Sequence, residues 1–256
     1  MPDADLADGW APGHETDTLL RAGTEAWIDD ACHVARARGG RVDDRGDVVL
    51  VDQGFPSLFT AMCFLRGRVE ADRVDTAWFD GAFAVVSPVP TADLRPLGLE
   101  LVGHPPFMAR PPGGDPPPLG GRRVVEVDDA EGIAAWERCL VEGFPLPAGA
   151  TPWTPGAIVD ARVLGGGSRF WIGVDDDGAV VACSGAHVAH GVVEVAYVAT
   201  MPSARGRGWG EVLTWAATTA DPALPAVLVA SDDGRPIYER MGYLPLCRFT
   251  MWARTS

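Results

Sequence analysis

Three glycines at alternate positions separate an apolar run from a stretch with helical spacing. The apolar run ends at Ala199, and the glycines are Gly206, Gly208 and Gly210. Glycine has no Cβ, so a phosphate can approach the main chain closely, and the N–H groups at the start of the next helix point at such an anion. The segment is therefore predicted to bind a phosphorylated ligand.

Two common nucleotide-binding motifs do not fit this segment. A P-loop requires Gly-Lys-Ser/Thr after the glycines, and no such triplet follows here. The dinucleotide motif requires glycine three residues after Gly208, where this chain has Glu211. Nucleotide hydrolysis and hydride transfer are therefore not expected.

Residues 198–210 resemble the acetyl-CoA signature of the GNAT superfamily of N-acetyltransferases. The core of that signature is Arg/Gln-x-x-Gly-x-Gly/Ala, and Arg205, Gly208 and Gly210 fill it. The resemblance implies that acetyl-CoA is the acyl donor and a co-substrate.

A second segment, residues 230–243, is similar to the GNAT segment that ends in Tyr-x-x-x-Gly-aromatic. Here Tyr238, Gly242 and Tyr243 occupy the matching positions. The two motifs follow each other in the family's order, and the resemblance covers residues 122–256. It implies the GNAT fold, an α/β (α+β) fold with a mixed, mostly antiparallel central sheet flanked by helices.

The resemblance also implies which residues contact the acyl donor. In the family, main-chain groups of the strand before the loop pair with the pantetheine arm, and main-chain donors of the loop hold the pyrophosphate. The matching residues are Val198 and Thr200 on the strand, and Arg205, Gly206, Arg207, Gly208, Trp209 and Gly210 in the loop. Ser231 stands where many relatives place a cofactor-contacting Asn or Ser.

Acyl transfer to an amine needs an acid and a base. The resemblance implies that Tyr238 protonates the departing thiolate, which suits a phenol with a pKa of ~10. An alkyl amine with a pKa of ~10.4 is almost wholly protonated at pH 7, so a base must remove its proton. Glu194 is our hypothesis for the base, and His187, His190 and Tyr197 are the alternatives. No metal is expected, because the two histidines would face opposite sides of a strand.

The function predicted on these grounds is an N-acetyltransferase that transfers an acetyl group to a primary amine by direct attack on the thioester. The acceptor would be a small-molecule or peptide amine, and its recognition is expected in irregular loops such as 144–155. The alternative is a non-catalytic acyl-CoA-binding sensor or scaffold, which needs the loop but not Tyr238.

Periodicity after residue 122 predicts alternating strands and helices. A helix is expected to begin at Asp128 or Asp129, and 192–199, apolar on both faces, is expected to be a central strand. The other expected elements are strands at 123–127, 169–174, 179–188 and 226–230, helices at 211–219 and 236–240, and two strands within 243–252. The aspartate run 175–177 lacks the further ligands of a calcium loop and is expected to be a turn.

Proline and glycine are concentrated between Pro105 and Gly121, which predicts a linker. The expected domains are 1–110, a degenerate GNAT-like domain without a cofactor loop, the linker 111–121, and 122–256, the acetyltransferase domain.

A shift of the chain against itself by 144 residues suggests an internal repeat and hence a tandem fold. The shift places Val85 on Val229 and Gly98 on Gly242, since 229 − 85 and 242 − 98 are both 144. It also places residues 61–66 on the glycine loop and Leu94 on Tyr238, so neither function would survive in the first half. That half is expected to contain a helix at 16–37 and strands at 48–52 and 58–65, and either to cover the acceptor side of the second half or to form a subunit interface.

Composition excludes several function classes. The 256 residues carry 21 basic and 35 acidic side chains, a net charge of −14, and all basic side chains are arginine. Such a balance argues against nucleic-acid binding, which depends on clustered cations.

No apolar run approaches the ~20 residues that span a bilayer, and residues 1–5 lack a leader pattern. We therefore expect a cytoplasmic monomer or homodimer without a membrane partner, its 5 cysteines being free thiols.

Overall fold

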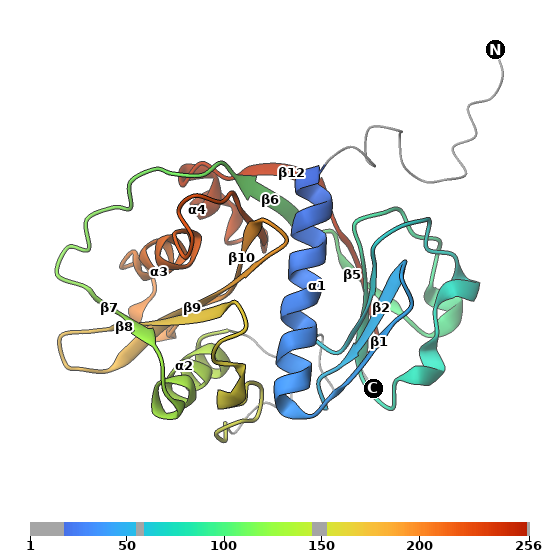
Figure 1. Cartoon of the computed structure of the whole chain (residues 1–256), viewed down its shortest axis with the longest axis horizontal. Coiled ribbons are helices and arrows are strands. Elements are labelled where there is room, and N and C mark those ends of the chain that lie inside the picture. The colour runs from blue at the N-terminus through green and yellow to red at the C-terminus, as the bar shows by residue number, and fades with distance from the viewer. Residues whose placement is uncertain (1–17, 55–58, 145–152, 255–256) are drawn as a thin grey trace, which may run out of the picture.

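Two β-sheets lie on either side of one long helix, α1 (Thr18–Arg38), in the computed structural model of the chain (Figure 1). The structure describes residues 18–54, 59–144 and 153–254. Residues 1–5, for which no leader is predicted, the predicted helix start at 16 and most of the predicted recognition loop 144–155 lie outside the described residues.

Each sheet is antiparallel except for one parallel pair. The first sheet has the order β1-β2-β3-β4-β13-β5, with β1 Arg41–Asp44, β2 Val48–Asp52, β3 Ala61–Phe64, β4 Phe83–Ser87, β13 Thr250–Arg254 and β5 Glu100–Gly103. The second has the order β12-β6-β11-β10-β9-β8-β7, with β12 Leu244–Arg248, β6 Pro106–Arg110, β11 Ala226–Val229, β10 Val192–Thr200, β9 Val180–Ala189, β8 Ser168–Val174 and β7 Arg123–Val127. The predicted fold class is confirmed.

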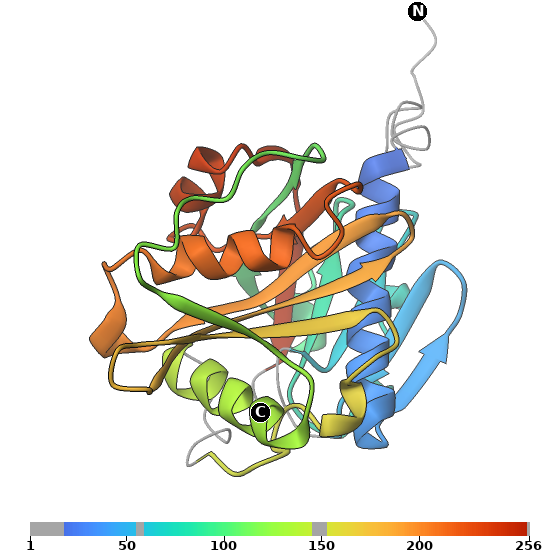
Figure 2. The ribbon, with the colours of Figure 1, turned by 60° about the vertical axis from the view of Figure 1, so that its left-hand side comes forward.

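Three further α-helices cover the second sheet: α2 (Ala130–Gly143), α3 (Trp209–Thr218) and α4 (Arg235–Arg240). Helix α2 lies on one face and α3 on the other (Figure 2). Asp129 caps α2, because its side chain accepts a hydrogen bond from the N–H of Gly132. Short 3₁₀ helices occur at η2 (Ala71–Arg73), η3 (Thr76–Trp78), η4 (Arg95–Leu97), η5 (Ala161–Val163) and η6 (Pro202–Ala204).

The two halves of the chain exchange a strand. Strand β6, from the first half, lies between β12 and β11 of the second sheet, while β13, the last strand, lies between β4 and β5 of the first sheet. The sheets therefore do not coincide with the expected ranges 1–110 and 122–256. Each sheet depends on main-chain hydrogen bonds from the other half.

The internal repeat holds in the last part of each half. Adding 144 to the bounds of β5 and β6 gives 244–247 and 250–254, and the structure has β12 at 244–248 and β13 at 250–254. The prediction that 61–66 matches the glycine loop is wrong. Strand β3 (61–64) pairs in parallel with β4, as β10 does with β11, so β3 corresponds to β10 instead. Between β3 and β4 the structure has the 3₁₀ helices η2 and η3, and no α-helix corresponding to α3.

Helix α1 packs against both sheets and joins them in one core. Its buried apolar side chains contact β2 and β3 of the first sheet and Val192, Val227 and Phe107 of the second. At Gly23 a Cβ would lie 2.5 Å from the ring of Phe107, so glycine lets the helix approach β6 closely. The first half thus covers the face of the second sheet that also carries α2 (Figure 2).

Cutting the chain within 111–121 tests the strand exchange. Fragments 1–116 and 117–256 should each fail to fold alone, because each loses a strand from the interior of its sheet and leaves main-chain groups unpaired. When the two fragments are co-expressed, they should purify together. Circular dichroism should then show that the complex unfolds in urea in one transition. A cooperative transition for either isolated fragment would contradict the exchange.

Candidate functional site

The glycine loop joins β10 to α3 and leaves a row of main-chain donors free. Gly206 and Gly208 have φ values of 73° and 77°, in the left-handed region that favours glycine. Among the described residues, none accepts a hydrogen bond from the main-chain N–H groups of 206–211. These donors lie at the start of a ten-residue helix, where the helix dipole favours an anion.

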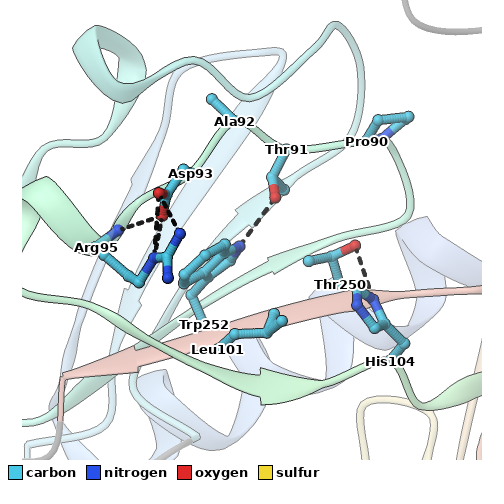
Figure 3. A pocket seen from close by; sticks show the side chains of 9 residues that line it. All are labelled: Pro90, Thr91, Ala92, Asp93, Arg95, Leu101, His104, Thr250 and Trp252. Atoms are coloured by element: carbon cyan, nitrogen blue, oxygen red, sulfur yellow. Dashed lines mark hydrogen bonds and ion pairs between the residues drawn. The ribbon is translucent and has the colours of Figure 1, made fainter.

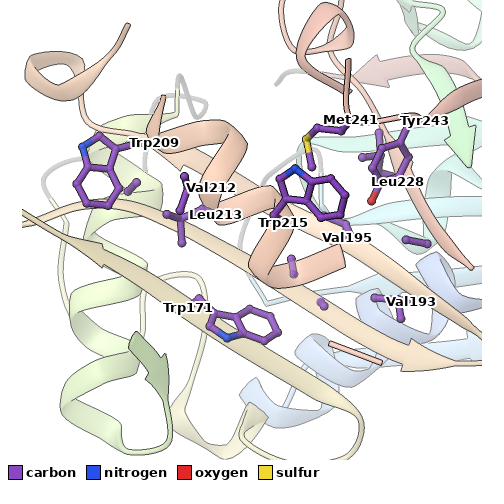
Figure 4. Packing of buried hydrophobic residues seen from close by; sticks show 14 of the residues in the cluster. Trp171, Val193, Val195, Trp209, Val212, Leu213, Trp215, Leu228, Met241 and Tyr243 are labelled. Carbon is purple, nitrogen blue, oxygen red and sulfur yellow. The ribbon is translucent and has the colours of Figure 1, made fainter. Parts of the chain in front are cut away.

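Packing fixes the start of α3 against the sheet. Trp209 lies over β8, where a Cβ at Gly173 would come 2.7 Å from the indole. One turn later, Leu213 and Trp215 are buried in the same apolar cluster (Figure 4). The free donors are therefore held by a rigid element.

Two of the three arginines at the loop bind main-chain groups of the protein with their side chains. Arg205 donates from Nη2 to the carbonyl oxygen of Gly143 at 2.9 Å, so it binds the end of α2. Arg122 donates from Nε to the carbonyl oxygen of Arg207 at 3.1 Å and was not predicted from the sequence. The guanidinium of Arg122 also lies 5.8 Å from the ring of Trp209. Arg207 is exposed.

Strands β10 and β11 separate next to the loop. They pair only at Val193 with Ala226 and at Glu194 with Val227, although β10 continues to Thr200. A bulge interrupts the pairing of β10 with β9 after Ala196, and Tyr197 there has a φ of 57°. The predicted donor-binding residues Val198 and Thr200 thus lie on the separated part of β10.

Tyr238 and Ser231 lie around α4. The Tyr238 ring packs edge-on against Tyr243 with ring centres 6.0 Å apart, and burial raises its pKa to about 12. Ser231 is exposed, and its Oγ accepts a hydrogen bond of 3.1 Å from the N–H of Gly234 at the start of α4. Tyr238 packs with the α3 side of the sheet.

Glu194 lies on the opposite face, toward α1. It is 2% exposed, and its Oε2 has no hydrogen-bond partner. Burial, and next the negative charge of Asp30, raise the pKa of this carboxyl well above its usual range. Glu194 stands directly across from His187 in the β9–β10 pair, so the two side chains share one face.

The alternative bases occupy three different environments. His187 is buried, with Nδ1 2.9 Å from the hydroxyl of Ser168. Tyr197 donates from its hydroxyl to Asp30 at 2.6 Å, and burial, followed by the charge of Asp30, raises its pKa well above the usual range. His190 lies in the β9–β10 turn, 3.6 Å from a carboxylate oxygen of Glu25. The described residues contain no cluster of three or more potential metal ligands.

A buried carboxylate that sequence reasoning missed holds the segment after 152. Glu137, on α2 and fully buried, accepts hydrogen bonds from the indole of Trp153 and from the N–H groups of Gly156, Ile158 and Val159. Its signal in the sequence is weak, because all four donors are 16 or more residues away along the chain.

The first half has a hollow of about 510 Å³ beside η4 (Figure 3). Within it, Trp252 donates to Thr91 at 2.9 Å, and Arg95 pairs with Asp93 at 2.7 Å. None of the predicted site residues lines this hollow. No helix in the described ranges has the length and apolar character needed to cross a membrane.

Residues 134–243 match the family model described as the acetyltransferase (GNAT) family. A GCN5-related N-acetyltransferase from Kribbella flavida is 22% identical with a TM-score of 0.61, and the match covers 90% of this chain and 96% of that one. A putative GNAT acetyltransferase from Novosphingobium aromaticivorans is 19% identical with a TM-score of 0.56, covering 87% and 96%. A functionally unknown protein from Staphylococcus epidermidis is 11% identical with a TM-score of 0.55, covering 86% and 95%. The shared fold therefore extends over both halves. No curated protein matches this chain.

Alanine at Gly208 should destabilise the protein, whereas alanine at Gly210 should not. An L-residue in the left-handed region that Gly208 adopts costs about 1–2 kcal/mol. Gly210 lies within α3, where alanine is favoured over glycine by about 1 kcal/mol, and its Cβ would meet nothing closer than Thr200 Oγ1 at 3.8 Å. Urea unfolding should show shifts of opposite sign; shifts of the same sign would contradict this description of the loop.

Glu137→Gln should lower the free energy of unfolding by about 2–4 kcal/mol, because an amide nitrogen replaces one oxygen and leaves two of the four donors without an acceptor. Glu142→Gln on the same helix is the control. Its pair with Arg138 is an exposed i,i+4 ion pair worth about 0.5 kcal/mol. Equal effects of the two substitutions in urea unfolding would show that Glu137 does not anchor the segment.

Proposed function

We propose that the chain transfers an acetyl group from acetyl-CoA to a primary amine, and the match of residues 134–243 to the acetyltransferase (GNAT) family model supports this proposal. The observation that carries the proposal is the row of free N–H groups at the start of α3, together with the separation of β10 from β11 after Glu194. An elongated donor with a pyrophosphate at one end and a thioester at the other fits this combination.

Main-chain groups bind the donor in this proposal. The N–H groups of 206–211 hold the pyrophosphate, and the separated part of β10, with Val198 and Thr200, pairs with the pantetheine arm. The side chain of Arg205 has a supporting task instead, because it already binds Gly143. Ser231 orders the start of α4 and faces solvent beside the site.

Glu194 and Tyr238 act on the thioester from opposite faces of the sheet. Glu194 removes a proton from the ammonium group, and the nitrogen keeps the electron pair. That pair attacks the thioester carbon, and the carbon–sulfur bond breaks as the amide forms. Tyr238 gives its phenolic proton to the sulfur, the nitrogen loses its second proton as the amide forms, and that proton restores the phenol. Burial then keeps the phenol protonated, because its pKa is about 12.

Several observations favour Glu194 over the alternative bases. Tyr197 is already a hydrogen-bond donor to Asp30, and its raised pKa leaves it protonated. His190 precedes β10, so it is separated from the bulge at 197 by roughly 16 Å of strand. Glu194 has a raised pKa, which makes its carboxylate a stronger base than an ordinary glutamate.

Acetyl-CoA turnover over a panel of primary amines, with Tyr238→Phe as the test variant, checks this function. The variant should lose about 10²- to 10⁴-fold in kcat and should retain acetyl-CoA binding by calorimetry. Tyr243→Phe is the matched control, because that hydroxyl only meets Thr218 at 2.6 Å and its loss should leave kcat within a few-fold. Since the pKa of Tyr238 is about 12, deprotonation of this acid should not lower kcat below about pH 10.

A non-catalytic acyl-CoA sensor or scaffold is the competing function. It would bind acetyl-CoA with the same loop and would turn over no amine of the panel. Equal kcat values for the wild type and Tyr238→Phe would instead refute the role of the acid while leaving an enzyme.

A further inference from the structure

Helix α1, from the half without a glycine loop, places carboxyl groups beside Glu194. Tyr197 on β10 donates to Oδ2 of Asp30 at 2.6 Å, and Oδ1 of Asp30 lies 3.9 Å from Nδ1 of His187. One residue earlier, Asp29 accepts a hydrogen bond of 3.0 Å from Nε2 of His187. His33 completes this face of the helix, its ring centre 5.8 Å from that of His187.

Among the described residues, these groups form a buried acidic cluster without a neighbouring guanidinium or ammonium group. Asp30 and Glu194 are both buried, and no arginine in the described ranges forms an ion pair with either of them or with Asp29. The sequence contains no lysine. The titratable groups closest to Glu194 are Asp30 of α1, the phenols of Tyr197 and Tyr243, and His187, which stands across from it on β9. Asp29 and His33 of α1 contact His187.

The unpartnered Oε2 of Glu194 indicates that a donor is missing from this face. A buried carboxylate without a hydrogen bond is strongly unfavourable unless it is protonated or meets a charged partner. An ammonium group has three donors and a positive charge, and so it satisfies both the orphan oxygen and the charge imbalance.

We infer that α1 completes the acceptor site, and this inference rests on the proposed function. Asp30 and Glu194 together bind the ammonium group of a cationic alkyl amine. His187 and Asp29 conduct the proton that this group loses to the surface. The acceptor class is therefore an amine that is charged in solution, in preference to a weakly basic aromatic amine.

The proton path follows the contacts. The ammonium N–H bond breaks toward Glu194, which becomes neutral, while the nitrogen keeps its electron pair. Within the carboxyl pair the proton passes to Asp30, and a bridging water carries it over the 3.9 Å from Oδ1 of Asp30 to Nδ1 of His187; the Nε2 proton of that ring then leaves through Asp29. The Asp29 side chain is 45% exposed, so the proton reaches water. The three carboxyl groups return to their starting states, whereas His187 is left as the other tautomer and regains the first one by proton exchange before the next turnover.

Asp30→Asn in the full chain tests the inference, with n-butylamine as the charged probe and aniline as the uncharged one. The variant should raise KM for n-butylamine by about 10- to 100-fold, with KM for acetyl-CoA and the parameters for aniline within about three-fold. Tyr197→Phe, which keeps the carboxylate, should raise KM for n-butylamine less than Asp30→Asn does. Asp93→Asn removes the same charge from the exposed Asp93–Arg95 pair of the first half and should change nothing.

Two outcomes separate this inference from the proposed function. Turnover of n-butylamine with an unchanged KM in Asp30→Asn would overturn the inference and leave the acetyltransferase in place. If no amine is acetylated, calorimetric binding of n-butylamine by the wild type and its loss in Asp30→Asn would support the α1 site while refuting the enzyme. Equal binding by both proteins would overturn the inference.

Thermal unfolding shows whether Asp30→Asn folds. If it does not fold, Asp29→Asn takes its place as the test variant. Asp29→Asn is expected to flatten the pH profile of kcat and to leave KM unchanged.

Discussion

Main-chain pairing across the exchanged strands is the constraint on which the rest of the structure depends. Strand β6 hydrogen-bonds to β11 and β12, and β13 hydrogen-bonds to β4 and β5, so each sheet is closed by the other half. Because α1 is buried against both sheets, its position is set by the same exchange. The carboxyl groups that α1 presents to β10 are therefore located by strands far from them in sequence.

The local elements of the second half were predictable because their signals are local. Alternating apolar residues indicated β7, and Asp129 with Ile133 and Trp136 indicated the capped helix α2. Gly206 and Gly208 were recognisable because only a few residue types accept a positive φ. The assignment of strands to sheets was not predictable. Residues 106–110 form β6, so the prediction that the linker begins at Pro105 is wrong. Residues 106–109 are all buried, and an apolar strand fits the interior of either sheet equally well.

Much of the candidate site depends on contacts between distant segments, which explains what the sequence did not reveal. Glu137 is a plain helical glutamate until residues 153–159 fold over it. Asp30 has the spacing of an ordinary amphipathic helix, and its importance depends on the bulge that turns Tyr197 toward α1. Glu194 was predicted as a base, and its unpartnered oxygen comes from the burial that α1 imposes. The two halves thus divide the proposed chemistry: one binds the donor and the other shapes the acceptor side.

The exchanged strands also constrain how such a chain can evolve. In a simple tandem repeat, the copy that lacks the glycine loop would be free to accumulate substitutions or to disappear. Here its β6 is an interior strand of the other sheet, and β13 has the same position in return. Loss of either copy would remove a strand from the surviving one, so the half without the loop remains under selection for as long as the other half functions.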